Sequence, residues 1–437
     1  MDEITSTFNA FFDMHLDALE LTTILLCLAS VFSLINLRLL KLPQTIGLMV
    51  LALALSLSIL VLGFIYPKIF NLAVFITTEF DFSEMLIHVM LPLLLFAGAL
   101  TINVKEFLKE KVTILSLATF GVIFSTFVVG SFTYSLINHP FFNLGHLGIS
   151  YVDCLLFGSL IAPTDPIAVL SMVKKMNLSK TTETRIAGES LFNDGIGVVL
   201  FLTLLNVKAD GVDNVTAMSV GSLFVTEVVG GIALGAIIGY LGLKLVEYVE
   251  NEHVELEVLI TLALVLFVAV VSTRLHFSAP LGVVVLGLFL NQSSKEEEGS
   301  EKAMGDYVYK FWHLLDETLN AILFILIGLE IIILFRDFNP IYLLLSIITI
   351  IVVVLSRGIG VFIPIKILSF FKNFEKNTAM IITWGGLRGG LSIALALNLP
   401  DTLGDGKSLI LILTYAVVLF TILVQGLSMN KMVKSLS

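Results

Sequence analysis

Three acidic side chains, Asp165, Glu189 and Asp194, lie inside runs of apolar residues that are long enough to cross a bilayer. A carboxylate at hydrocarbon depth is costly where it faces lipid, so it persists mainly where it faces the protein interior or a water-filled cavity. Two prolines, Pro163 and Pro166, flank the first of these acids and predict a break in that helix. Broken helices at mid-membrane depth expose backbone carbonyls to a cation in ion transporters. We therefore expect the chain to fold around a polar site inside the membrane.

The composition indicates an all-α polytopic membrane protein. Of the 437 residues, 57% are hydrophobic and 14% are charged, whereas soluble domains carry about 25% charged residues. The net charge of −10 comes without a basic stripe, which argues against a nucleic-acid partner. We expect one membrane domain over residues 1–437 with no soluble domain. Its roughly thirteen predicted spans are 19–39, 43–64, 82–101, 112–137, 151–173, 184–206, 218–246, 255–273, 276–291, 311–335, 341–370, 377–399 and 408–429.

The distribution of basic residues predicts the orientation. If the N-terminus lies outside, most of the lysines and arginines fall in cytoplasmic loops, as the positive-inside rule requires. We therefore expect a multi-pass protein of the inner (plasma) membrane with a cytoplasmic C-terminus. Residues 1–18 are predicted to form either a short interfacial helix or an extension of the first span.

Two of the predicted spans are interrupted at corresponding places. The fifth span is broken at Pro163–Pro166, and the twelfth at Gly385–Gly390, where four glycines disfavour a continuous helix. The interrupted spans are the fifth span of the first half (spans 1–6) and the fifth span of the second half (spans 8–13). This correspondence predicts inverted repeats and points to a transporter binding site. Close helix packing through small residues is the alternative for the glycines, but Arg388 in their midst disfavours it.

Crossing breaks bring the ends of four half-helices together. Helix N-termini carry about half a positive charge and C-termini about half a negative one. Asp165 is expected to neutralise the N-termini and Arg388 the C-termini. A direct role of Asp165 as a cation ligand is the competing interpretation.

The sixth span carries two pairs of polar residues at helical spacing. Ser190 and Asp194 are four residues apart, as are Glu189 and Asn193, so each pair shares a helix face. Hydroxyl, carboxylate and freed carbonyl oxygens together suit Na⁺ or another small hard cation. A carboxylate that titrates near neutral pH holds a proton or a cation and seldom both, which would give exchange. The alternative is that Asp194 is locked in a hydrogen bond between helices.

Glu189 needs a positive partner at that depth, and Arg357 in the eleventh span is the expected one. The alternative for Arg357 is a side chain that reaches the cytoplasmic surface. Glu227 also lies within a span, without an assigned role. The sequence has no phosphate-binding loop, nucleophile elbow or zinc-protease motif. We therefore expect that the protein is neither an enzyme nor an ATP-driven pump, and that it needs no cofactor.

Four motifs together resemble the monovalent cation:proton antiporters of the sodium/proton exchanger family, which includes bacterial NhaP-type antiporters and the animal NHE exchangers. The resemblance covers essentially the whole chain and implies an NhaA/NhaP-like fold in a homodimer embedded in membrane lipid. It implies dimerisation helices at roughly 19–64 and 218–291, and a mobile core at roughly 82–206 and 311–429. The motifs are Ala162-Pro163-Thr164-Asp165-Pro166, Glu189-Ser190-Leu191-Phe192-Asn193-Asp194-Gly195, Ser356-Arg357-Gly358 and Gly385-Gly386-Leu387-Arg388-Gly389.

The same resemblance implies roles for individual residues. Asp194 would bind the ion and the proton, with Ser190 and the Thr164 backbone as further Na⁺ ligands. Glu189 and Arg357 would form an ion pair that stabilises the core. With Asn193 directly before the aspartate, the chain resembles the branch of the family that exchanges one cation for one proton without net charge movement.

One departure affects ion preference. Many bacterial members have a glutamate in the third span, after a motif that here reads Leu91-Pro92-Leu93-Leu94-Leu95-Phe96, and this chain has Ala97 in its place. The expected activity is electroneutral Na⁺/H⁺ antiport serving pH and sodium homeostasis, with Li⁺ as a possible further substrate. K⁺(Rb⁺)/H⁺ antiport is the alternative. A passive cation channel or an ion sensor is disfavoured, because a pore would favour rings of like side chains or a carbonyl filter.

Overall fold

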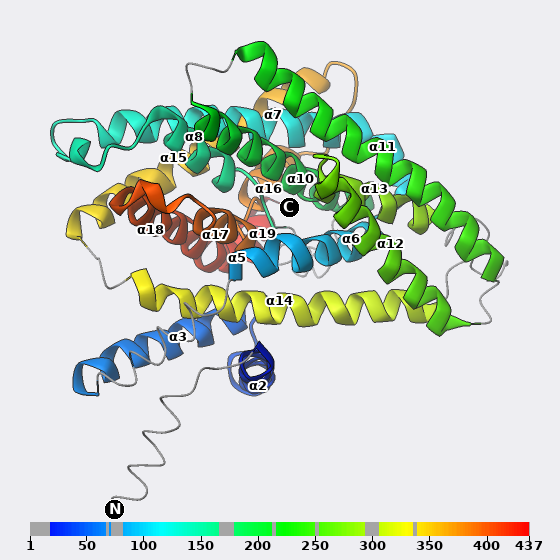
Figure 1. Cartoon of the computed structure of the whole chain (residues 1–437), viewed down its shortest axis with the longest axis horizontal. Coiled ribbons are helices and arrows are strands. Elements are labelled where there is room, and N and C mark those ends of the chain that lie inside the picture. The colour runs from blue at the N-terminus through cyan, green and yellow to red at the C-terminus, as the bar shows by residue number, and fades with distance from the viewer. Residues whose placement is uncertain are drawn as a thin grey trace, which may run out of the picture. The chain divides into compact units, whose positions relative to one another are not determined.

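The computed structural model describes residues 18–66, 70, 82–165, 179–211, 216–249, 253–292, 306–334 and 339–436 (Figure 1). All regular secondary structure in these residues is helical, which confirms the predicted all-α class. Of the N-terminal segment 1–18, predicted to be an interfacial helix or an extension of the first span, residues 1–17 lie outside the described residues. The same holds for Pro166 and the second half of the predicted fifth span, residues 166–178.

The α-helices follow the predicted spans closely. They are α2 (Ala18–Ile35), α3 (Gln44–Ile65), α5 (Phe82–Met85), α6 (Leu91–Thr101), α7 (Val104–Ile137), α8 (Tyr151–Ile161), α10 (Lys180–Asp210), α11 (Ala217–Val249), α12 (Val254–Arg274), α13 (Ala279–Gln292), α14 (Asp306–Leu334), α15 (Pro340–Leu368), α16 (Thr378–Trp384), α17 (Gly390–Leu397), α18 (Asp405–Phe420) and α19 (Leu427–Leu436).

Eight helices of the described chain are long and apolar enough to cross a membrane. Three shorter apolar helices, Leu86–Thr101, Tyr151–Ile161 and Ala279–Asn291, add to them. The total of thirteen crossings stays a prediction. Both predicted breaks are present: α8 ends at Ile161 and is followed by non-helical backbone, and five non-helical residues separate α16 from α17.

Several helix ends differ from the predicted boundaries, and two of the larger differences have a clear structural cause. The helix predicted to begin at residue 112 begins at Val104, because the Asn103 side chain caps it by accepting a hydrogen bond from the Glu106 N–H (3.2 Å). At the other end of the chain, a π-helical stretch, Thr421–Gly426, joins α18 to α19, so helix continues to Leu436 beyond the predicted last span. In both cases the apolar pattern marks only part of a longer helix.

The chain forms two compact units. The smaller contains α2, α3 and the part of α14 from Asn320 onward. In it Ser56 donates a hydrogen bond to the Gly328 carbonyl (2.7 Å), so α3 and α14 approach closely. The larger unit contains the other helices. This division does not follow the predicted dimerisation and core ranges, which remain a functional prediction.

The larger unit is built around α7 and α10. Helix α7 packs against α8, α10 and α15, and α17 packs against α18 and α8 (Figure 1). Helices α11, α12 and α13 pack against one another, and α13 also packs against α6. These contacts bring α8, α10, α15 and the α16–α17 break together.

A second buried region of this unit, here called the apolar cluster, surrounds Ala97. Ala97 is 4% exposed, and the neighbouring Phe96 ring lies 4.5 Å from the Trp312 ring between centroids. Trp312 also donates from its indole nitrogen to the Thr261 hydroxyl (3.0 Å). The other buried members are Leu100, Val246, Val265, Val268, Ala269, Val283, Leu286, Leu290 and Val308.

Candidate cation and proton site

Arg388, which lies in the second break (Gly385–Gly390), binds backbone carbonyls of the first break (after Ile161). After α8 ends, the carbonyls of Ala162 and Pro163 are free of the helix, and both accept hydrogen bonds from Arg388 Nη1, the latter at 2.9 Å. Arg388 is 1% exposed. A guanidinium on helix C-terminal carbonyls stabilises the negative end of the helix dipole. The structure thus places Arg388 on a half-helix C-terminus.

The backbones of the two breaks cross and bond to each other. The Asp165 N–H donates to the Leu387 carbonyl (2.7 Å), and the Arg388 N–H donates to the Thr421 hydroxyl (3.1 Å). A side-chain carbon at Gly389 would lie 2.8 Å from the Asp165 carboxylate, which explains why this position is glycine. The close approach of the Asp165 side chain to the second break therefore depends on the glycine at position 389.

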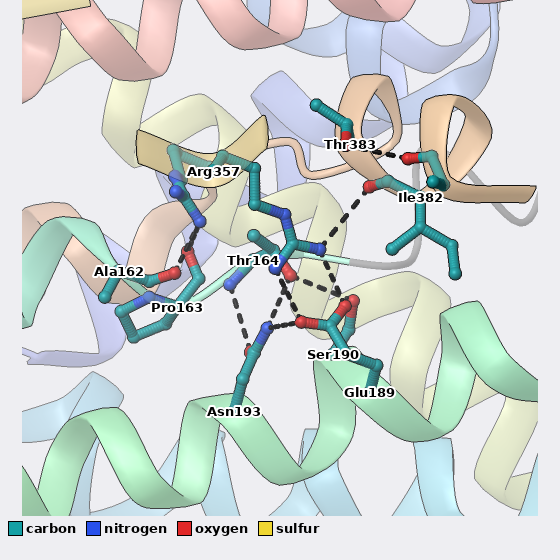
Figure 2. A network of polar contacts seen from close by, with 11 residues as sticks. Ala162, Pro163, Thr164, Glu189, Ser190, Asn193, Arg357, Ile382 and Thr383 are labelled. Atoms are coloured by element: carbon teal, nitrogen blue, oxygen red, sulfur yellow. Dashed lines mark hydrogen bonds and ion pairs between the residues drawn. The ribbon is translucent and has the colours of Figure 1, made fainter. Parts of the chain in front are cut away.

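Helix α10 supplies an amide and a hydroxyl to the first break (Figure 2). Asn193 accepts a hydrogen bond from the Thr164 N–H (3.1 Å) and donates to the Thr164 hydroxyl (2.7 Å). The Thr164 and Ser190 hydroxyls share a further hydrogen bond of 3.1 Å. All three side chains are at most 1% exposed. The break and α10 are thus joined by three hydrogen bonds between buried groups.

Glu189 and Arg357 form a bidentate ion pair, visible in Figure 2. Arg357 donates from Nη1 to Glu189 Oε1 (2.6 Å) and from Nη2 to Oε2 (2.8 Å). Asn193 also donates to Glu189 Oε1 (2.9 Å), and the Ile382 carbonyl accepts a weaker bond from Arg357 Nη2 (3.4 Å). The Glu189 carboxylate is 1% exposed and is saturated by three donors. Parallel charge-assisted bonds of this kind fix geometry as well as contributing energy.

Asp194 differs from Glu189 although the two lie on the same helix. Its carboxylate is partly exposed and accepts no hydrogen bond from the residues that the structure describes. The charged groups that act on it are Asp165, Glu189 and Arg388. It lies one helical turn beyond Ser190, on the same face. Asp194 is therefore the acidic residue of this region whose carboxylate oxygens accept no hydrogen bond from the described residues.

Asp165 is also partly exposed, and its backbone and side chain both lie against the second break. Across the described residues, no three His, Cys, Asp or Glu side chains are grouped as they would be around a resident metal ion. The structure therefore brings all eight predicted residues into one region, with Asp165 beside Gly389 rather than in the Asn193 network.

Sequence reasoning missed the residues that hold α10 at its start. Glu110 of α7 is 3% exposed and pairs with Arg185 of α10 (2.8 Å) and with Lys372 (2.5 Å), which follows α15. It also missed the pairing of Asp153 with Lys208 at the other end of α10. The available signal was that each acid lies within one or two turns of a helix end. Their partners are distant in sequence, so spacing alone does not reveal them.

The chain is similar to known proteins over almost its whole length. A family model described as "Sodium/hydrogen exchanger, transmembrane" matches residues 24–435. The Na⁺/H⁺ antiporter NhaP of Pseudomonas aeruginosa is 41% identical over 421 residues, which cover 95% of this chain and 96% of that protein. The Na⁺/H⁺ antiporter NhaH of Halobacillus aidingensis is 32% identical, covering 91% of this chain and 93% of that protein.

Among solved structures, the sodium proton antiporter MjNhaP1 of Methanocaldococcus jannaschii superimposes with a TM-score of 0.71 at 20% identity. The match covers 95% of this chain and 97% of that one. At this identity the likeness concerns the fold, and it confirms the predicted antiporter architecture.

Proposed function

The chain belongs to the sodium/hydrogen exchanger family, a family of membrane transporters rather than of catalytic enzymes, and we propose that it is a secondary active Na⁺/H⁺ antiporter. Two curated relatives that share more than 90% of its length carry that activity in their names. Membership makes the chain a multi-pass membrane protein, and its resemblance to bacterial antiporters indicates the plasma membrane. The N-terminus is proposed to lie outside and the C-terminus in the cytoplasm.

The proposal rests on the contrast between Glu189 and Asp194. Glu189 is saturated by Arg357 and Asn193, whereas Asp194 accepts no hydrogen bond from the described residues. A carboxylate without a partner inside a membrane-spanning segment binds a proton or a cation rather than remaining an uncompensated charge. Asp194 is thus proposed to bind H⁺ and Na⁺ in turn, with the oxygens of Ser190 and Thr164 as further ligands.

Competition for one carboxylate fixes the exchange ratio. Asn193 does not titrate, and both carboxylate oxygens of Glu189 are bound by Arg357. Asp165 and Arg388 are proposed to compensate the charges at the ends of the broken helices. With Asp194 as the exchanging group, one proton leaves when one cation binds, so the two loaded states carry the same net charge. Exchange would be 1:1 and electroneutral, by alternating access of a homodimer.

K⁺(Rb⁺)/H⁺ antiport is a second candidate, favoured by one observation. Ala97 stands where many bacterial relatives have a glutamate, and here it lies in the apolar cluster. A site with fewer charged oxygens has a weaker field and discriminates less strongly in favour of a small cation. Ion preference would then shift from Na⁺ toward larger alkali cations.

Reconstitution tests both candidates. Purified protein in liposomes with an imposed pH gradient is given Na⁺, Li⁺, K⁺ or Rb⁺ in turn, and collapse of the gradient is followed with a pH-sensitive dye. Proton movement on addition of Na⁺, absent from protein-free liposomes, is the expected result. Movement with K⁺ and Rb⁺ alone would replace the first candidate by the second, and cation flux without proton movement would contradict both.

A further inference from the structure

A groove opens between the end of α15 and the start of α16, away from the Asn193 network. Its volume is about 490 Å³. Its apolar wall includes Phe362, Ile363 and Met380, whose side chains are 53%, 37% and 47% exposed. Lys366 also lines it, one turn further along α15 than Phe362. The groove is therefore an apolar channel with a cationic group beside it.

Lys366 lines this groove, and Lys376 directly follows the groove residue Glu375 in the sequence. Neither Lys366 nor Lys376 forms an ion pair or donates a side-chain hydrogen bond within the described residues. Lys372, by contrast, is bound to Glu110 (2.5 Å). The acid in the groove wall, Glu375, already accepts a hydrogen bond from the Thr182 hydroxyl (3.1 Å). With Lys372 paired to Glu110, Lys366 and Lys376 outnumber Glu375, so this segment keeps an excess of positive charge.

The segment between α15 and α16 also carries apolar side chains that face outward. Phe370 is 80% exposed and Phe371 is 86% exposed. They directly follow the last turn of α15 and stand between Lys366 and Lys372. Alternation of basic and large apolar residues is typical of segments that lie in the interfacial region of a bilayer. The groove therefore opens where lipid headgroups meet acyl chains.

We propose that this groove binds one anionic phospholipid, with an acyl chain along Phe362, Ile363 and Met380 and the phosphate beside Lys366. Lys376 supplies the second positive charge. In the proposed orientation this end of α15 faces the cytoplasm, where anionic lipids give the leaflet its negative surface potential. Basic pockets between transmembrane helices on that side suit such headgroups.

The same segment holds the first turns of α10. Besides the bond from Thr182 to Glu375, the Phe374 ring lies 4.6 Å from the Arg185 guanidinium, centroid to Cζ. A lipid in the groove restrains the segment that makes these contacts. Lipid binding therefore stabilises the start of the helix that carries Glu189 and Asp194, and it raises the melting temperature of the whole protein.

The test measures lipid retention and thermal stability of the purified full-length protein in detergent. Dioleoyl phosphatidylglycerol, dioleoyl phosphatidylcholine and sn-glycerol 3-phosphate are added separately, and bound molecules are counted by native mass spectrometry. We expect retention and a higher melting temperature with phosphatidylglycerol alone. Equal effects of the two lipids, or an effect of glycerol phosphate equal to that of phosphatidylglycerol, would overturn the proposal.

Variants locate the site. K366Q should weaken phosphatidylglycerol binding about fivefold, since a basic residue near an anionic surface contributes about 1 kcal/mol, and K366Q/K376Q should weaken it further. M380Q keeps both lysines and should shorten retention by placing an amide in the acyl path. The matched control is K431Q/K434Q on α19, whose lysines are exposed on the same proposed side. Retention that falls equally in this control, or that is unchanged in K366Q/K376Q, would contradict the assignment.

Discussion

Two buried regions of the larger unit contrast sharply in chemistry. The crossing of the two breaks holds Glu189, Arg357 and Arg388 within hydrogen-bond distance of amide, hydroxyl or carbonyl groups. The apolar cluster around Ala97 and Trp312 is dominated by aliphatic and aromatic side chains. Position 97, where the family resemblance led us to look for a carboxylate, is instead an alanine packed among apolar side chains. The carboxylate proposed to take part in exchange lies on α10.

The largest effect is expected at Asp194. Asp194→Asn removes the group proposed to take H⁺ and Na⁺ while keeping its size, so exchange should fall at least about a hundredfold, equivalent to about 2.7 kcal/mol. Na⁺-driven proton movement in liposomes measures it. Asp210→Asn, at the end of the same helix, is the matched control and should transport normally. Wild-type exchange rates in Asp194→Asn would contradict the proposal that the polar region, and Asp194 in it, carries the exchange.

The ion pair should dominate the stability of the crossing. Glu189→Ala and Arg357→Ala each leave a buried charge unpaired, at a cost of about 3–5 kcal/mol, seen as a lower melting temperature in detergent. The double variant should lose less than the sum of the two single losses. Strict additivity would mean that the pair is not coupled.

An exposed pair provides the control for this experiment. Lys109 and Glu106 lie 2.7 Å apart on α7, with the lysine side chain 68% exposed. Surface pairs of this kind contribute little. Alanine at either position should therefore leave the melting temperature nearly unchanged. A loss as large as that in Glu189→Ala would show that burial is not the cause.

Introducing a carboxylate into the apolar cluster also tests the contrast between this cluster and the polar crossing of the two breaks. Ala97→Glu adds volume and a charge beside Phe96, and should destabilise the protein by about 2–4 kcal/mol. Ala97→Gln has the same shape without the charge and should be milder. If Ala97→Glu instead tightened Na⁺ binding without a loss of melting temperature, the position would belong to the cation site.

The smallest effect is expected at Trp312. Trp312→Phe keeps an aromatic ring against Phe96 but removes the donor to the Thr261 hydroxyl, which is 0% exposed. Loss of that bond should cost about 1 kcal/mol and leave the exchange rate unchanged. A large drop in exchange without a drop in melting temperature would mean that the cluster acts directly in transport.

The sequence predicted the helices and both breaks because their signals are local. Apolar runs mark the spans, and Pro163 and the Gly385–Gly390 stretch mark the interruptions. The eight proposed site residues were predicted for a related reason: a charged or polar group inside an apolar run is conspicuous. These arguments say which residues are buried in the membrane, and they need no knowledge of the fold.

Other features could not be predicted because they depend on which distant segments meet. The Asp165 N–H bonds to the Leu387 carbonyl, a backbone contact that no side-chain pattern encodes. Glu110 binds Arg185 and Lys372 from two further elements. Glu227 stays without a role: it lies on α11, which contributes no residue to the network in the described chain. Helix ends were missed where polar turns continue an apolar helix, as at Val104.

The central claim is that one carboxylate, Asp194, exchanges one proton for one cation. Its most direct test is transport in liposomes whose membrane voltage is set by valinomycin and K⁺ gradients, with Na⁺ as the test ion. We expect the rate of Na⁺/H⁺ exchange and the pH gradient reached at equilibrium to be independent of the membrane voltage. We also expect the apparent KM for Na⁺ to rise as the pH falls, because protons then occupy Asp194. A rate or gradient that follows the imposed voltage would contradict the claim, since a second charge, carried by Asp165 or Glu227, would have to move.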